Sequence, residues 1–207
     1  MNIQDILDPQ KLISLFGLIG VFAVIFAESG LFFGFFLPGD SLLFTAGLLS
    51  SQGLLPFWIL LIGVFVAAVL GDNVGYWFGK KIGPALFVKE DSFFFKRKYI
   101  AQAQHFYEKY GKKTIILSRF IPIVRTFAPI VAGIGDMNYR IFFIYNIVGG
   151  FIWSVGLTVL GYVLGNTIPG IDKYLLPIIL FIIFVSFLPP IYQVLKSYLE
   201  KNKNIVQ

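Results

Sequence analysis

The chain has no cysteine and a single histidine, His105, among its 207 residues. The absence of cysteine excludes disulfides, thiolate catalysis and cysteine-ligated metal sites, and one histidine cannot form a histidine metal site alone. We therefore expect neither a metal nor a cofactor. We also expect no cleavable signal peptide, because residues 1–11 are mildly acidic and the first apolar run is not followed by a cleavage site of small residues.

Charge is scarce as well, at 14% of residues, whereas 57% are hydrophobic. A soluble domain carries about 25% charged residues. No Asp, Glu, Lys or Arg occurs within residues 41–71, 141–171 or 174–194. Each of these stretches is long enough to cross a hydrocarbon core of roughly 30 Å as a helix. The sequence therefore predicts an all-α polytopic membrane protein.

The net charge of +6 comes mainly from lysines and arginines that flank the apolar runs. Nine of them lie within residues 80–113, which the positive-inside rule places in the cytoplasm. The adjacent Phe93–Phe95 and Lys96–Lys98 favour an amphipathic element on anionic lipid. Lysines that follow the last apolar run predict a cytoplasmic C-terminus. This pattern reflects membrane topology, and we expect no nucleic-acid partner.

Two apolar segments, residues 28–49 and 114–135, are broken by residues that disfavour a straight helix. A proline inside a helix costs about 3 kcal/mol. We interpret both segments as re-entrant hairpins, which membranes tolerate only where protein or a wet cavity surrounds them. The predicted breaks are at Pro38, Gly39, Pro122 and Pro129.

The order and direction of the predicted membrane crossings place the two hairpins on opposite membrane faces. This arrangement predicts an inverted repeat within a single membrane domain, residues 1–207. Thr45–Gly47 and Val131–Gly133 are a weak sequence echo between the repeats. Inverted repeats with broken helices form substrate sites in many transporters. The predicted parts are an interfacial lead-in (1–11), a first repeat (12–79), a cytoplasmic linker (80–113), a second repeat (114–165) and a final transmembrane helix (174–195).

Glycines recur at every fourth position in the second half of the first long span. One helix face therefore lets another backbone approach closely. This face suits packing within one chain or between copies in a homo-oligomer. The predicted packing glycines are Gly71, Gly75, Gly79 and Gly83. Likewise, we expect Asn146 and Trp153 to pack or form hydrogen bonds within the bundle.

Five ionisable residues lie inside apolar segments, and each costs about 2.5–3.5 kcal/mol at a helix centre on insertion scales. They must therefore pair or line a wet cavity. If the hairpins meet, Glu28 and Asp40 of the first face Arg119 and Arg125 of the second. The fifth, Asp72, either joins this chemistry or caps a helix break at Gly71.

Guanidinium groups bind phosphate in a two-pronged geometry, and buried carboxylates take up protons more readily than exposed ones. Arg119 and Arg125 are thus candidate ligands for a lipid phosphate, with Glu28, Asp40 and Asp72 for proton coupling or ion pairing. A static salt-bridge lock between the hairpins is the alternative.

The sequence resembles the DedA family, whose members are also called SNARE-associated or VTT-domain proteins. The resemblance spans roughly residues 12–195. It rests on motifs in matching order: Glu28–Gly30, Phe36–Ser41, Gly71–Gly79 with Gly83, Ser118–Arg125, Pro129–Gly133, and Asn146 with Gly149 and Trp153. It implies that Glu28, Asp40, Arg119 and Arg125 match positions that the family requires for function.

The resemblance implies a multi-pass protein of the bacterial cytoplasmic membrane whose partners are membrane lipids and protons. Family activities include flipping of undecaprenyl phosphate or phosphatidylethanolamine, proton-dependent transport and lipid scrambling. We expect a flippase that recycles undecaprenyl phosphate, since two arginines suit a monophosphate. A phosphatidylethanolamine flippase or scramblase, a proton-coupled cation antiporter and a structural protein stay open. An enzyme such as a lipid phosphatase is not expected. It would need a nucleophilic histidine in a polar motif, and the only histidine, His105, lies in a lysine-rich loop.

Overall fold

The computed structural model describes residues 9–31, 37–88, 113–168 and 177. Within these ranges the chain forms helices and turns, without a strand. The helices are α2 (Pro9–Gly30), α3 (Gly39–Ser51), α4 (Phe57–Val88), α6 (Thr114–Ser118), α7 (Pro122–Ile134), α8 (Tyr139–Gly150), the π-helix η2 (Phe151–Val155) and α9 (Gly156–Thr167). The all-helical prediction is confirmed for this part of the chain.

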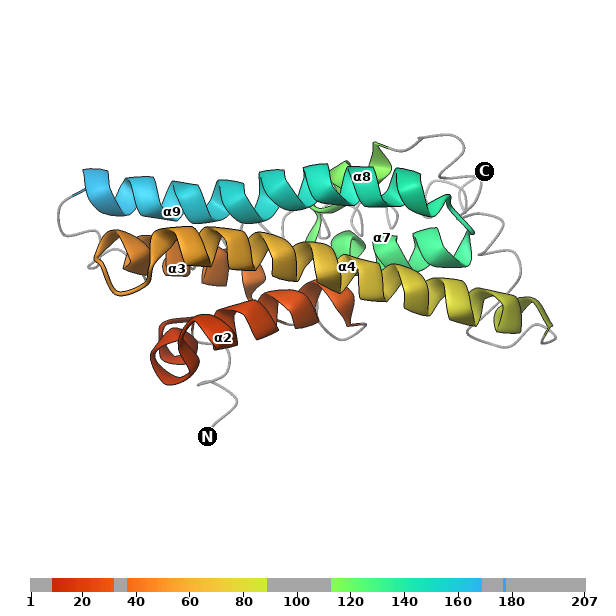
Figure 1. Cartoon of the computed structure of the whole chain (residues 1–207), viewed down its shortest axis with the longest axis horizontal. Helices are drawn as coiled ribbons and strands as arrows, with labels where there is room; N and C mark the ends of the chain where they lie inside the picture. Colours follow the sequence, from red (N-terminus) through yellow and green to blue (C-terminus); the bar gives the residue numbers. More distant parts are fainter. Residues whose placement is uncertain (1–8, 32–36, 89–112, 169–176, 178–207) are drawn as a thin grey trace, which may run out of the picture.

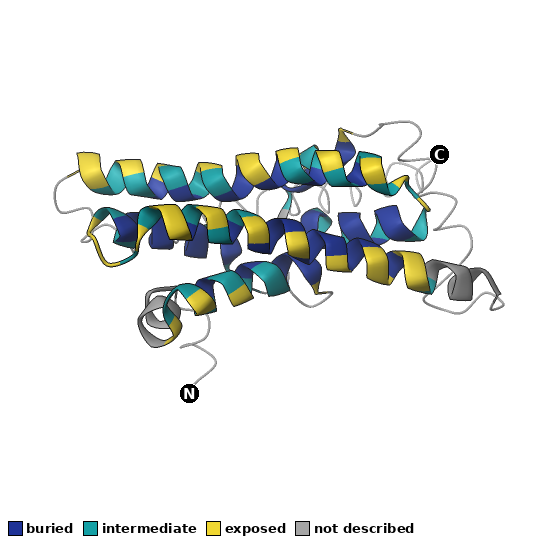
Figure 2. Ribbon diagram, viewed as in Figure 1, coloured by how far each residue is buried: buried dark blue, intermediate teal, exposed yellow. Residues whose placement is uncertain are grey.

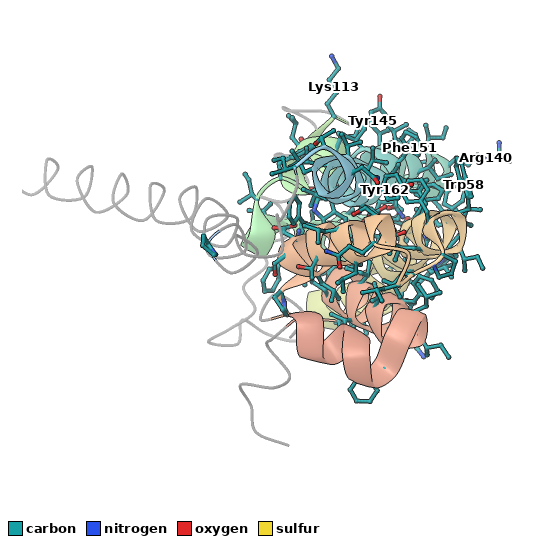
Figure 3. All side chains as sticks on the ribbon, turned by 90° about the vertical axis from the view of Figure 1, so that its left-hand side faces the viewer. Trp58, Lys113, Arg140, Tyr145, Phe151 and Tyr162 are labelled. Atoms are coloured by element: carbon teal, nitrogen blue, oxygen red, sulfur yellow. The ribbon has the colours of Figure 1, made fainter. Side chains whose placement is uncertain are left out.

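Two helical stretches are long and apolar enough to cross a membrane: Phe57–Ile82 of α4, and Tyr139–Thr167, in which α8, η2 and α9 run on as one helix. They lie side by side in Figure 1. Their outward faces are apolar, with Trp58 72% and Phe151 56% exposed; Figure 3 labels both. Large apolar side chains on the outside of a bundle are what a lipid environment favours.

The shorter helices α3 and α7 lie behind these two long helices and are largely buried (Figures 1 and 2). α3 packs along α9, and α7 packs along α4. α3 and α7, one helix from each predicted hairpin, therefore pack mainly on the long helix of the other half of the chain. α2 lies on the other side of α4 and also contacts α3.

Glycines make these contacts close, and they do so reciprocally. A Cβ atom on Gly47 of α3 would overlap the Thr158 carbonyl of α9, and one on Gly161 would overlap the Phe44 carbonyl of α3. The same holds between α7 and α4, for Gly133 against Tyr76 and Gly79 against Ile130. The two predicted echo segments thus occupy matching positions, each pressed on the opposite long helix.

Gly71 and Gly75 belong to the same tight face of α4. A Cβ atom on Gly71 would lie 2.6 Å from the Phe26 carbonyl of α2, and one on Gly75 would lie 3.4 Å from Pro129 of α7. The predicted glycine face therefore contacts α2 at one end and α7 at the other. Gly83 lies in α4, but its side-chain environment is outside the described residues.

The breaks fall partly where the sequence places them. α3 begins directly after Pro38, and α7 begins at Pro122. The break predicted at Pro129 is wrong, because α7 continues through it to Ile134. Proline removes one backbone donor, and its ring is accommodated here against Gly75 of the neighbouring helix.

Two further boundaries differ from expectation. The hairpin predicted to begin at residue 28 starts later, since α2 continues through Glu28 to Gly30; the irregular point of α2 is Gly17, with φ +57°. The helix break proposed at Gly71 is absent, because α4 runs unbroken through Asp72. The proposed lead-in (1–11), linker (80–113) and final helix (174–195) lie mostly outside the described residues.

Two substitutions on α9 test the glycine packing. Gly161→Ala should lower the melting temperature in detergent micelles, since overpacking costs about 1–3 kcal/mol. Gly156→Ala should leave it unchanged or raise it, because a Cβ there meets open space and Gly in a helix is about 0.5–1 kcal/mol less favourable than Ala. Equal shifts for the two variants would contradict the close α3–α9 contact.

Candidate functional site

Arg125 lies near the start of α7 and joins side chains from two other helices. Its Nη1 donates to Asp40 Oδ1 at 2.5 Å, and its Nη2 donates to Glu28 Oε1. Asp40 is the second residue of α3, and Glu28 is two residues from the end of α2. One guanidinium thus connects α2, α3 and α7.

Trp153 of η2 completes this group. Its Nε1 donates to the same Asp40 Oδ1 at 2.7 Å, and its ring centroid lies 4.6 Å from Arg125 Cζ. A guanidinium over a tryptophan face is stabilised by about 0.5–2 kcal/mol. We call Glu28, Asp40, Arg125 and Trp153 the Arg125 cluster.

Gly39 provides the space for this cluster. A Cβ atom at Gly39 would overlap the carboxylate of Glu28, so any side chain there would displace that group. The break residue Gly39 is therefore also the residue that lets Glu28 approach the start of α3. Thr126 of α7 adds a contact by donating from Oγ1 to the Glu28 backbone carbonyl at 3.4 Å.

Arg119, which follows α6, forms a separate group. It donates to Asp72 Oδ2 of α4 and to Asn146 Oδ1 of α8. Asn146 in turn donates from Nδ2 to the Val69 carbonyl of α4 at 3.1 Å. We call Asp72, Arg119 and Asn146 the Arg119 cluster. The four-residue arrangement expected from the sequence is thus divided between two clusters, with Asp72 as the carboxylate partner of Arg119.

Both clusters are largely buried, and Asp40, whose side chain is 18% exposed, is their most accessible member. Glu28 is fully buried, and Arg119 and Arg125 are 3% and 8% exposed. An open hollow of about 450 Å³ lies elsewhere, between Lys80 of α4 and residues 136–140, which include Asp136 and Arg140. A ligand that contacts the buried guanidinium of Arg125 must therefore displace side chains that now surround it.

The two clusters differ in charge. In the Arg119 cluster one guanidinium faces one carboxylate, and the remaining partner is an amide. In the Arg125 cluster one guanidinium faces two carboxylates. Glu28 Oε2 has no hydrogen-bond partner among the described residues, although it is buried. An excess carboxylate in an apolar interior favours the uptake of a proton or a cation.

Comparison with known proteins identifies one matching family model and several related proteins. Residues 37–163 match the VTT domain. Protein DedA of Escherichia coli is 45% identical over 178 residues, which cover 85% of this chain and 81% of that protein. The chain belongs to the DedA family.

Other relatives of this DedA-family protein are also membrane proteins by name. An uncharacterized membrane protein of Mycobacterium leprae is 48% identical over 180 residues, 87% of this chain and 80% of the relative. Inner membrane protein YqjA of Escherichia coli is 35% identical over 171 residues, 78% of this chain and 77% of the relative. No solved structure matches the chain. Together with its apolar helices, these relatives identify an integral membrane protein.

The sequence indicated Glu28, Asp40 and Arg125 as one site, and the structure brings these three together. The sequence analysis gave Trp153 and Asn146 only a packing or hydrogen-bonding role and did not predict their contacts with the two arginines. One signal was available: the two residues are seven apart, which places them on one face of a helix. Asn73, which accepts from Tyr139 at 2.9 Å, was not singled out.

The Arg119 cluster should be essential to folding. Asp72→Asn leaves a buried guanidinium without its counter-charge, and breaking a buried pair costs about 3–5 kcal/mol. We expect a clear loss of thermal stability in detergent micelles.

The matched control is Asp136→Asn, which breaks the exposed Lys80–Asp136 pair, whose charged atoms are 3.2 Å apart. Exposed pairs contribute about 0–1 kcal/mol, and Asn tolerates the positive φ of Asp136. A larger loss for Asp136→Asn than for Asp72→Asn would contradict the assignment.

Proposed function

We propose that this protein is a membrane lipid transporter that moves a phosphate-bearing lipid across the bacterial cytoplasmic membrane, with undecaprenyl phosphate as the first candidate. The observation that carries the proposal is Arg125, a buried guanidinium held by exchangeable carboxylates from two other helices. Its chemistry suits the recognition of an anion.

A lipid phosphate competes with Glu28 and Asp40 for the same donors. Guanidinium groups bind phosphate oxygens as they bind carboxylates, through parallel charge-assisted hydrogen bonds. If the phosphate takes Arg125, the ion pairs that connect α7 to α2 and α3 are broken. Ligand binding is thereby coupled to the relative movement of these helices, as alternating access requires.

The charges favour coupling to protons. When a phosphate occupies Arg125, Glu28 and Asp40 lose their shared cation, and a fully buried carboxylate without a counter-charge, such as Glu28, is unfavourable in an apolar interior. Uptake of a proton removes this cost. A proton gradient can therefore drive exchange between the carboxylate-bound and phosphate-bound states of Arg125.

The reciprocal packing supports the proposed inverted repeat with two re-entrant segments. Gly47 and Gly133, from the two echo segments, each contact the long helix of the other half. Both clusters lie where these elements meet, as in transporters built from inverted repeats. We propose that the C-terminus is cytoplasmic, following the lysines after the last apolar run.

A proton-coupled cation antiporter is the second candidate. It is favoured by the excess carboxylate of the Arg125 cluster and by the unpartnered Oε2 of Glu28. In that case the cation would occupy the carboxylates, and Arg125 would only organise them. A phosphatidylethanolamine flippase or scramblase uses the same phosphate chemistry, so the choice of lipid must come from the assay.

Transbilayer movement in liposomes tests the proposal. We expect the protein to move a labelled polyprenyl phosphate, and Arg125→Ala to slow this about 10- to 100-fold, since a charged hydrogen bond contributes about 1.5–3 kcal/mol. Arg140→Ala is the matched control, because Arg140 is exposed and outside both clusters; it should keep wild-type activity.

Parallel liposomes with labelled phosphatidylethanolamine, or with a cation-sensitive dye, distinguish the other candidates. Movement of phosphatidylethanolamine alone would replace the first candidate lipid. Cation exchange by folded protein without movement of either lipid would contradict lipid transport and favour the antiporter.

A further inference from the structure

Trp153, from the long helix α8–η2–α9, contacts both Asp40 and Arg125. It is 4% exposed, donates to Asp40 and stacks on Arg125. It lies in a single π-helical turn, Phe151–Val155. Such turns are rare and are found frequently at functional sites. The geometry around Trp153 therefore points to a function beyond packing.

The two carboxylates of the Arg125 cluster are not equivalent. Asp40 Oδ1 accepts from both Arg125 and Trp153. Glu28 Oε1 accepts from Arg125, whereas Oε2 has no partner in the described part of the chain. If Arg125 turns to another anion, Asp40 keeps the indole N–H as a donor, and the Glu28 carboxylate keeps none.

This difference decides where a proton goes. A hydrogen bond donated to a carboxylate stabilises its ionised form, and burial without a donor destabilises it. We propose that Trp153 is a positioning residue that keeps Asp40 ionised while Arg125 binds a ligand phosphate, so that the accompanying proton is taken up by Glu28. The inference rests on the proposed phosphate site and assigns its proton acceptor.

Among the described residues, the surrounding elements contain few charged groups that compete with Glu28 for the proton. α3 has Asp40 as its only Asp, Glu, Lys or Arg, and α9 has none. On α4, Asp72 pairs with Arg119, and Lys80 pairs with the exposed Asp136. The described side chains of α2 include only Glu28 among charged residues. Arg125 and Trp153 are thus the groups that face the two carboxylates from α7 and η2.

The same helix also contacts the other arginine. A Cβ atom on Gly149 would lie 2.9 Å from Arg119 Cδ, and Asn146 accepts from Arg119. Trp153, one turn further on, contacts Arg125. A movement of the π-helical turn would therefore change the environments of both guanidinium groups together.

Proton linkage gives a direct test. The affinity for a short-chain polyprenyl phosphate is measured in detergent micelles between pH 5.5 and 8. By linkage, the slope of log Kd against pH gives the number of protons taken up on binding, to within about half a proton. The ionisation of the lipid phosphate itself is common to all variants and cancels in their differences. The variants are Trp153→Phe, Glu28→Gln and the double variant Trp153→Phe/Asp40→Asn.

Relative to wild type, Trp153→Phe should add up to about one proton to the slope, because Asp40 loses the indole donor and protonates more readily. The double variant should return to the wild-type slope, because its amide at position 40 cannot titrate. Glu28→Gln should lose about one proton. An unchanged slope in Trp153→Phe, or in Glu28→Gln, would overturn the inference. Absence of binding by the wild-type protein would instead overturn the proposed function and the inference with it.

A second measurement leaves Trp153 in place. The chain has three tryptophans, and Trp58 and Trp77 are exposed. In a Trp58→Phe/Trp77→Phe protein, the emission of Trp153 should change when the polyprenyl phosphate binds, and the matched polyprenol should have no effect. Emission that stays constant while the lipid phosphate binds would overturn the inference.

Discussion

A guanidinium group buried among apolar helices cannot stand alone, and this constraint determines much of the structure. Arg125 requires counter-charge, and it obtains it from Glu28 of α2 and Asp40 of α3. These contacts connect segments 85 and 97 residues away from Arg125 in sequence. Gly39 lacks a side chain where the Glu28 carboxylate lies, and Trp153 covers the other face of the guanidinium. The ion pairs therefore explain the positions of three helices and a π-helical turn.

Glycine packing makes these charge contacts geometrically accessible. Gly47 and Gly161 bring α3 against α9, and Gly79 and Gly133 bring α7 against α4. In a membrane, where burial of apolar surface contributes little between helices, close backbone approach and polar contacts hold helices together. The Arg119 cluster adds a charge-balanced connection between α4, α8 and the segment before α7. It lacks the excess carboxylate that makes the Arg125 cluster suited to exchange and proton uptake.

The composition predicted the helical membrane class, and isolated charges in apolar runs indicated where the site would be. The start of α3 after Pro38 and of α7 at Pro122 followed from proline geometry. The partner of Arg119 did not follow, because spacing specifies a helix face but not which helix packs against it. Asp72 and Asn146 are remote in sequence and meet Arg119 only through tertiary packing. Pro129 was misjudged because α7 continues through it, where it packs close to Gly75 of α4.

The central claim is that Arg125 exchanges its carboxylate partners for a lipid phosphate. The most direct measurement is the dipolar coupling between ³¹P of a polyprenyl phosphate and ¹⁵N-labelled arginine side chains, by solid-state NMR of protein in lipid bilayers. Arg125→Lys serves as the control that removes the guanidinium but keeps the positive charge. We expect coupling at hydrogen-bonding range in the wild type, lost in Arg125→Lys. Bound lipid without such coupling, or coupling that persists in Arg125→Lys, would contradict the account.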